Sequence, residues 1–242
     1  MEPAEYRERP APADLRPFVA CLWTRRDRDG AASHTVLPDG HVDVLVECGG
    51  SPRAFVAGAM TIPLHIPAAR ADIVAVRFKV GAARRFLRTD ACELNDAVVP
   101  LDALRRDGAA LVARVAAAGG PDERFAHVIA YLRGIYAGAE PPATVGAAAA
   151  RIAAGAGGID DGVCAALGVT PQSLARTFRQ HVGLSPKELS RVLRMQRALP
   201  AVRSAEQGLA EIALAFGYSD QSHLTQEFRR LTGSTPHRFR HG

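Results

Sequence analysis

The sequence has no long apolar run and no closely spaced cysteines. No uninterrupted hydrophobic stretch approaches the roughly 18–20 residues that a membrane-spanning helix needs. The first residues, Met1 to Arg9, mix acids and arginines where a signal peptide would be apolar. The four cysteines contain no CxxC pair, which argues against a zinc finger or a disulfide framework and for a reducing compartment. These absences exclude secreted, membrane-spanning and disulfide-stapled classes, and we expect a cytoplasmic protein that binds no membrane.

Motifs of catalysis are missing as well. The sequence shows no Ser/His/Asp order, no phosphate-cradling loop and no paired-carboxylate motif, so we expect no enzyme, no catalytic residue and no cofactor. His34, His41 and Asp43 are residue types that can hold a divalent metal on a small β-barrel. Strand alternation places only His41 and Asp43 on one face, so we expect surface or hydrogen-bonded side chains and no metal. Trp23, the one tryptophan, is expected in the core, with the wall of a ligand pocket as the alternative.

The net charge is confined to one part of the chain. Residues 1–140 of the 242 hold 18 Lys and Arg against 18 Asp and Glu. Residues 141–242 hold 12 basic and 7 acidic residues, so the whole excess of +5 lies there. This asymmetry predicts two domains, the second of which is a candidate for binding a polyanion. A merely soluble basic surface is the alternative.

The N-terminal part combines short strands with later helices, which predicts an α+β chain with a small, β-rich, barrel-like first domain. Pro38-Asp39-Gly40 favours a turn, and we expect a hairpin between Val36-Leu37 and Val42 to Glu47. Other strands are expected at 18–24, 54–57, 64–66 and 73–80, and helices at 83–87, 101–118 and 122–136. The predicted division is 1–119 for a sensor-like domain, 120–140 for a helical linker and 141–242 for the basic domain.

The helix expected at 122–136 carries an apolar stripe at helical spacing: Phe125, Val128, Ile129, Leu132 and Ile135. The stripe has two interpretations. It packs on its own domain, or it forms an intermolecular helix pair in a homodimer.

The basic part is predicted to be all helical, with four helix starts marked by Thr170-Pro171, Ser185-Pro186, Asp220 and Thr235-Pro236. Two of its segments resemble one another: GVTPQSLARTFRQHVGLSP, Gly168 to Pro186, and GYSDQSHLTQEFRRLTGSTP, Gly217 to Pro236. Each follows a short apolar helix. Short helix, glycine-containing turn and second helix form the helix-turn-helix pattern.

Residues 186–199 between the two copies predict an amphipathic linking helix with Leu189, Val192, Leu193 and Gln196 on one face. Such a spacer can hold two recognition helices in successive major grooves. Pro200 would remove an internal hydrogen bond, so we expect the linking helix to end at Leu199 or to kink there.

The C-terminal hundred residues resemble the DNA-binding domain of the AraC/XylS family of bacterial transcription regulators. The stretch AEIALAFGYSDQSHLTQEFRRLTGSTPHRFR, Ala210 to Arg240, is similar to the second helix-turn-helix unit and closing helix of that family. GVTPQSLARTFRQHVGLSPKEL matches the first unit. HTVLPDGHVDVLVE and VAVRFKVGAARRFL resemble a short sensor-like domain that precedes such domains in some members.

The resemblance and the expected outward faces of the two recognition helices give the candidate DNA contacts. Base contacts are expected from Gln172, Ala175, Arg176, Gln221, Ser222, Thr225 and Gln226, with Arg176 suited to the O6 and N7 atoms of guanine. Phosphate contacts are expected from Arg179, Arg194, Arg229, Arg230, Arg238 and Arg240. His223 is expected to pack at the turn, with a phosphate contact as the alternative.

The sequence thus predicts a sequence-specific regulator that binds double-stranded DNA. Contact with RNA polymerase, an unidentified small-molecule effector and a homodimer are open alternatives for its other partners. Two rival interpretations also stay open. One is a metal- or ligand-dependent enzyme domain fused to a DNA-binding domain, and the other is a constitutive DNA-binding protein whose first domain only dimerises.

Overall fold

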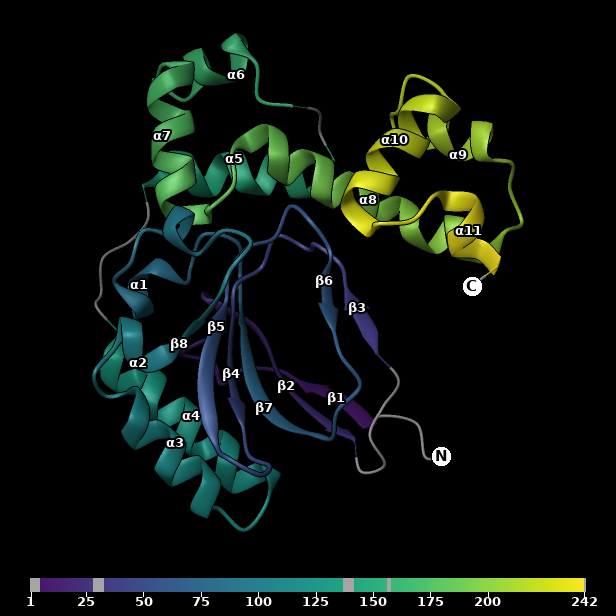
Figure 1. The fold of residues 1–242 in the computed structure, drawn as a ribbon. Helices are drawn as coiled ribbons and strands as arrows, with labels where there is room; N and C mark the ends of the chain where they lie inside the picture. The colour runs from purple at the N-terminus through teal and green to yellow at the C-terminus, as the bar shows by residue number, and fades with distance from the viewer. Residues whose placement is uncertain (1–4, 28–32, 137–141, 156–157, 242) are drawn as a thin grey trace.

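The computed structural model describes residues 5–27, 33–136, 142–155 and 158–241. Its N-terminal part is built on a six-stranded antiparallel sheet with the strand order β1-β2-β7-β4-β5-β8 and a small sheet that pairs β3 with β6 (Figure 1). The strands are β1 (Glu5–Arg9), β2 (Val19–Asp27), β3 (His34–Val36), β4 (Asp43–Glu47), β5 (Arg53–Ala57), β6 (Leu64–Ile66), β7 (Ala71–Phe78) and β8 (Val98–Pro100).

Side-chain alternation gives the large sheet two different apolar faces. On one face the valines of β4 and β7 join the main core, together with Leu22 of β2. This face is covered by α3 (Gly108–Ala117) and α4 (Pro121–Ile135). On the other face Trp23, Leu45 and Ala75 form a separate buried cluster. The N-terminal part also contains α1 (Arg84–Leu87), the 3-10 helix η1 (Ala91–Leu94) and α2 (Leu101–Leu104).

The predicted α+β class is confirmed, but three details of the N-terminal prediction are wrong. The turn at Pro38-Asp39-Gly40 does not close a hairpin, because β3 pairs with β6 while β4 pairs with β5 and β7. Strand β1 was not predicted, since its side chains are mostly exposed and its sequence lacks an apolar pattern. The helix expected over 101–118 is two helices, α2 and α3, separated at Arg105 to Asp107.

The apolar stripe of α4 packs on its own domain. Phe125, Val128, Leu132 and Ile135 are buried in the main core, and Arg124 forms an ion pair of 2.8 Å with Asp72 beside the sheet. The stripe therefore cannot form an intermolecular helix pair while it is packed in this way. The predicted domain boundary near residue 140 falls at 137–141, outside the described residues.

The C-terminal part is all helical in its described residues, as predicted. The helices are α5 (Ala143–Ala153), α6 (Asp161–Ala166), α7 (Pro171–Val182), α8 (Pro186–Ser204), α9 (Leu209–Ala215), α10 (Gln221–Thr232) and α11 (Pro236–His241). Along the described segments of the chain, no helix is both long and apolar enough to cross a membrane.

Helix α8 does not end at Leu199, as the sequence suggested, but continues through Pro200 to Ser204. The proline ring lies on the exposed side of the helix, while Leu199 and Val202 are buried on either side of it. In addition, the carbonyl of Val202 accepts a hydrogen bond of 3.1 Å from Nε of Arg240 in α11. Tertiary packing of the last turn thus compensates for the hydrogen bond that the proline removes.

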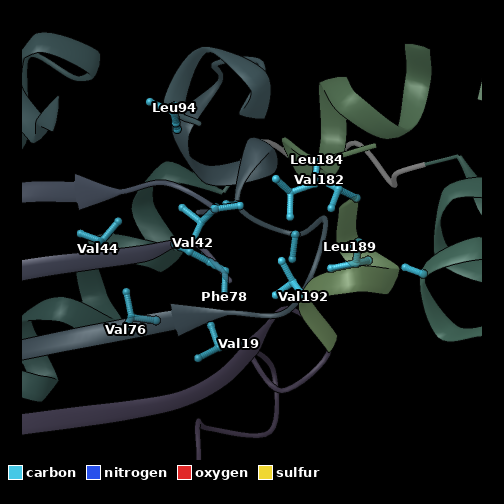
Figure 2. Packing of buried hydrophobic residues seen from close by; sticks show 14 of the residues in the cluster. Val19, Val42, Val44, Val76, Phe78, Leu94, Val182, Leu184, Leu189 and Val192 are labelled. Atoms are coloured by element: carbon cyan, nitrogen blue, oxygen red, sulfur yellow. The ribbon is translucent and has the colours of Figure 1, made fainter. Parts of the chain in front are cut away.

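The two parts of the chain share one apolar core. Leu184, Leu189 and Val192 of the C-terminal part lie against Val42 and Phe78 of the sheet domain (Figure 2). A Cβ at Gly40 would lie 2.6 Å from Cδ1 of Leu189, so α8 approaches the turn more closely than a side chain there would permit. The apolar face predicted for the linking helix is therefore buried against the N-terminal domain.

Candidate nucleic-acid interface

The first helix-turn-helix unit consists of α6 and α7. Gly168 leaves α6 with a φ of 67°, in the left-handed region that a glycine adopts without strain. Helix α7 then begins at a side-chain cap, because Oγ1 of Thr170 accepts a hydrogen bond of 3.1 Å from the backbone N–H of Ser173. Pro171 at the first helical position has no N–H to leave unpaired. The predicted start of this recognition helix is confirmed.

One side of α7 is fixed in the core and the other faces solvent. Leu174 and Phe178 are buried, as predicted. Gln172 and Arg176 are exposed and Ala175 is half-buried, so the three proposed base contacts share the outer side of the helix. The N-terminal half of α7 thus carries polar groups at the spacing that groove recognition uses.

The N-terminal domain contacts the opposite end of α7. Val182 at the end of α7 is buried, and α7 lies directly against η1. Burial at this contact, and then the positive charge of Arg84, lowers the pKa of His181, which favours the neutral imidazole. The end that meets the sheet domain is therefore not the end that carries Gln172 and Arg176.

The second unit consists of α9 and α10 and repeats the same construction. Gly217 has a φ of 76°, and the Asp220 carboxylate accepts a hydrogen bond of 2.8 Å from the backbone N–H of His223. That hydrogen bond lowers the pKa of Asp220, so the cap is ionised at neutral pH. Leu224 and Phe228 are buried, while four polar side chains lie on the accessible part of the helix: Gln221, Ser222, Thr225 and Gln226.

His223 packs at the turn, as predicted. Its Nδ1 accepts a hydrogen bond of 3.2 Å from the backbone N–H of Ser219. Its ring meets the Tyr218 ring edge to face, with the centroids 5.4 Å apart. Thr225 donates its hydroxyl to the carbonyl of Gln221 at 2.8 Å, an internal bond that a base contact would have to share or replace.

An ion pair between α8 and α10 was missed by the sequence analysis. Nε of Arg191 donates to Oε1 of Glu227, whose side chain is 9% exposed. Tyr218 is buried close by, and this burial raises the pKa of its hydroxyl to about 12. No sequence pattern indicates this pair, because Arg191 is one of several basic residues spread around the linking helix.

The proposed phosphate contacts fall into two groups. Arg179, Arg229, Arg230 and Arg238 are exposed. Arg194, by contrast, donates to the carbonyl of Gly217 at 3.1 Å and lies over the Tyr218 ring. Arg240 donates to the carbonyls of Val202 and Gln207. These last two arginines hold the second unit together whether or not they also touch a phosphate.

The three residues considered for a metal site have other partners. His34 faces the guanidinium of Arg25, with Nδ1 3.2 Å from Nη2. Nδ1 of His41 donates to the carbonyl of Phe78 at 2.8 Å. Asp43 accepts two hydrogen bonds from Arg77, at 3.2 and 3.1 Å. Each side chain is thus used in a protein contact.

Two parts of the chain match known protein families. Residues 163–242 match a family described as Helix-turn-helix domain, and residues 7–100 match one described as Domain of unknown function (DUF6597).

Two curated relatives match part of the chain. It is 35% identical over 69 residues to the HTH-type transcriptional regulator GlxA of Rhizobium meliloti, covering 28% of this chain and 21% of that protein. It is 32% identical over 71 residues to the HTH-type transcriptional activator RhaS of Escherichia fergusonii, covering 29% and 26%. The chain thus spans about a quarter of the length of these relatives. The names of both denote transcription regulators.

Two solved structures are similar to the chain. A transcriptional regulator with an AraC-type DNA-binding domain from Chromobacterium violaceum is 25% identical, with a TM-score of 0.37, covering 41% of this chain and 90% of that chain. ToxT from Vibrio cholerae is 11% identical, with a TM-score of 0.44, covering 98% and 97%. Residues 163–242 thus match a helix-turn-helix domain family, and the residues ahead of them, 7–100, match a family of unknown function.

Proposed function

We propose that the protein is a transcription regulator that binds double-stranded DNA sequence-specifically and reads two adjacent major grooves. The observation that carries this proposal is the pair of helix-turn-helix units with exposed polar recognition faces, joined by one continuous helix. Helix α8 has 19 residues, which makes it about 28 Å long at roughly 1.5 Å per residue. Successive major grooves on one side of DNA recur every ~34–36 Å, so a spacer of this length suits two neighbouring sub-sites.

In this proposal the side chains of the two recognition helices bind different bases. Arg176 reads guanine through its two parallel donors, and Gln172, Gln221 and Gln226 pair with adenine. The exposed arginines bind phosphates and supply most of the affinity, which therefore falls linearly with the logarithm of salt concentration.

The N-terminal domain is proposed to control DNA binding in response to an effector. Its direct contact with the linking helix supports this role. Nε2 of Gln196 donates to the carbonyl of Pro38 at 2.6 Å. The next residue of the turn, Asp39, lies 3.6 Å from Arg77, which lines a cavity in the sheet domain. The contacts of Arg77 with Asp39 and of Pro38 with Gln196 thus connect the cavity wall to α8.

A selection of genomic fragments with the purified full-length protein tests the proposed function. We expect enrichment of one motif with two sub-sites about ten base pairs apart. Recovery of unrelated fragments whose binding disappears as salt rises would mean a basic surface without sequence reading.

Two substitutions separate base reading from phosphate binding. We expect Arg176→Ala to relax the preferred sequence at one position, with a loss of about 1–3 kcal/mol in discrimination. Arg230→Ala is the matched control: it should weaken all DNA sequences about equally and reduce the slope of log K against log salt by about 1. Binding titrations on a specific and a scrambled duplex at several salt concentrations measure both. An unchanged preference in Arg176→Ala would remove this residue from the reading surface.

A further inference from the structure

The sheet domain contains an open cavity of about 910 Å³ on the face of the large sheet that carries Trp23, Leu45 and Phe55, and Gly108, Ala109 and Val112 of α3 line one edge of it. Its floor is a row of residues paired across four strands: Trp23 with Ala75, Ala75 with Leu45, and Leu45 with Phe55. The small β3–β6 sheet supplies further apolar wall residues, Val36, Leu64 and Ile66. A cavity of this volume and lining suits the apolar body of a small organic molecule.

Most charges in the wall of the cavity are already paired. Arg77 binds the Asp43 carboxylate at 3.1 Å, and Arg53 binds the Glu47 carboxylate at 2.6 Å. These cations and anions cancel in pairs. They therefore leave no net charge to attract a ligand.

Arg25 is the exception among the half-buried charged residues of the wall, whereas Arg70 and Asp102, which also line the cavity, are exposed. Its guanidinium faces His34, and no carboxylate in the described segments forms an ion pair with it. Burial, and then the nearby Arg25 charge, lowers the pKa of His34, so this histidine is neutral at neutral pH and does not add to the cation. Nε of Arg25 is buried and has no hydrogen-bond acceptor.

Trp23 supplies a second unused donor on the same side of the same strand. Residues 23 and 25 are two apart on β2, so both side chains point to the cavity face. Nε1 of Trp23 is also buried without an acceptor. An unpaired buried donor costs free energy, and an acceptor placed between these groups would recover it.

We propose that this cavity binds a small organic anion with an apolar body, whose carboxylate is held by Arg25 and Trp23. The body lies along the row of Trp23, Leu45 and Phe55, and the anionic group neutralises the guanidinium of Arg25. This proposal names the ligand class for the effector role proposed above and, as to regulation, rests on that role. Binding itself requires no DNA.

The test uses the full-length protein and three probes with the same chain and different head groups: octanoate, octanol and octylamine. Trp23 is the only tryptophan in the chain, so its fluorescence reports directly on the cavity. We expect a saturable emission change with octanoate, and a dissociation constant about tenfold or more below that of octanol, since charged hydrogen bonds are the stronger class. Octylamine should bind most weakly.

Variants locate the anionic group. Arg25→Gln should bring octanoate binding to the level of octanol. Arg26→Gln is the matched control, because Arg26 is the next residue of the same strand, does not line the cavity and should keep the preference. If Arg25→Gln does not fold, the three probes on the unmodified protein still decide the question.

Two results would overturn the proposal: no saturable change with octanoate, or octanol or octylamine binding as tightly as octanoate. A protein that binds octanoate but shows no sequence-specific DNA binding would refute the proposed function and leave the ligand class standing. Specific DNA binding without octanoate binding would refute the proposed ligand class and leave the proposed function standing.

Discussion

The Gly58→Ala variant is expected to lose about 3 kcal/mol or more of unfolding free energy, because the added methyl group has no space. Its Cβ would lie 1.7 Å from the carbonyl oxygen of Leu94. Neither backbone can move aside easily: the N–H of Gly58 donates to the carbonyl of Ala97 at 3.0 Å, and the N–H of Asp96 donates to the carbonyl of Ala59 at 3.2 Å. Since η1 ends at Leu94 and contacts α7, the damage should reach the first recognition helix.

Thermal unfolding of the purified variants measures this effect. For a chain of this size the loss corresponds to a fall of roughly 6–12 °C in Tm. Gly134→Ala makes the same chemical change in α4, where nothing lies within 4 Å of the new methyl group. We expect this control to gain about 0.5–1 kcal/mol, because alanine is the better helix former. Equal Tm values for the two variants would contradict the close approach of Gly58 to η1.

Arg191→Met is expected to lose about 3–5 kcal/mol, because it leaves the Glu227 carboxylate buried without its cation. The second oxygen, Oε2 of Glu227, is already buried without a hydrogen-bond partner, and Nε2 of His223 lies 4.0 Å from Oε1, beyond hydrogen-bond distance. We expect the substitution to weaken the contact between α8 and α10, which the ion pair joins. DNA affinity is therefore expected to decrease along with stability, although Arg191 touches no base in the proposed complex.

Chemical denaturation of three proteins isolates the ion pair. Arg229→Met removes an exposed arginine from α10 and should change the free energy of unfolding by no more than about 0.5 kcal/mol. The double variant Arg191→Met/Glu227→Leu should recover most of the loss, because it removes both charges and leaves an apolar contact. If the double variant is no more stable than Arg191→Met, the unpaired carboxylate is not the cause of the loss.

The helices of the C-terminal part were predictable because their starts are encoded locally. A cap oxygen and its partner N–H are three residues apart at Thr170, Ser185 and Asp220, and all three caps are present in the structure. Leucine and phenylalanine four residues apart then fix which side of α7 and α10 is buried. The proposed base contacts are residues on the opposite, more accessible side of these two helices.

The errors lie where distant segments decide the outcome. Pro38-Asp39-Gly40 has the composition of a hairpin turn, yet its two flanks belong to different sheets, and only the pairing of β3 with residues 64–66 reveals this. Similarly, Pro200 breaks an isolated helix, but here buried neighbours and Arg240 hold the turn around it. No window of sequence contains these partners, so composition and spacing cannot predict them.

The core shared by the sheet and α8 makes the two parts a single cooperative unit in the thermodynamic sense. Heat or denaturant should unfold them in one transition, and a weakened sheet should make the recognition helices easier to cleave by proteases. A fragment that begins at residue 142 would expose Leu184, Leu189 and Val192 to water, and self-association is its expected fate. The proposed DNA-binding surface therefore depends for its folding on the stability of the β-sheet, even though the sheet itself need not contact DNA.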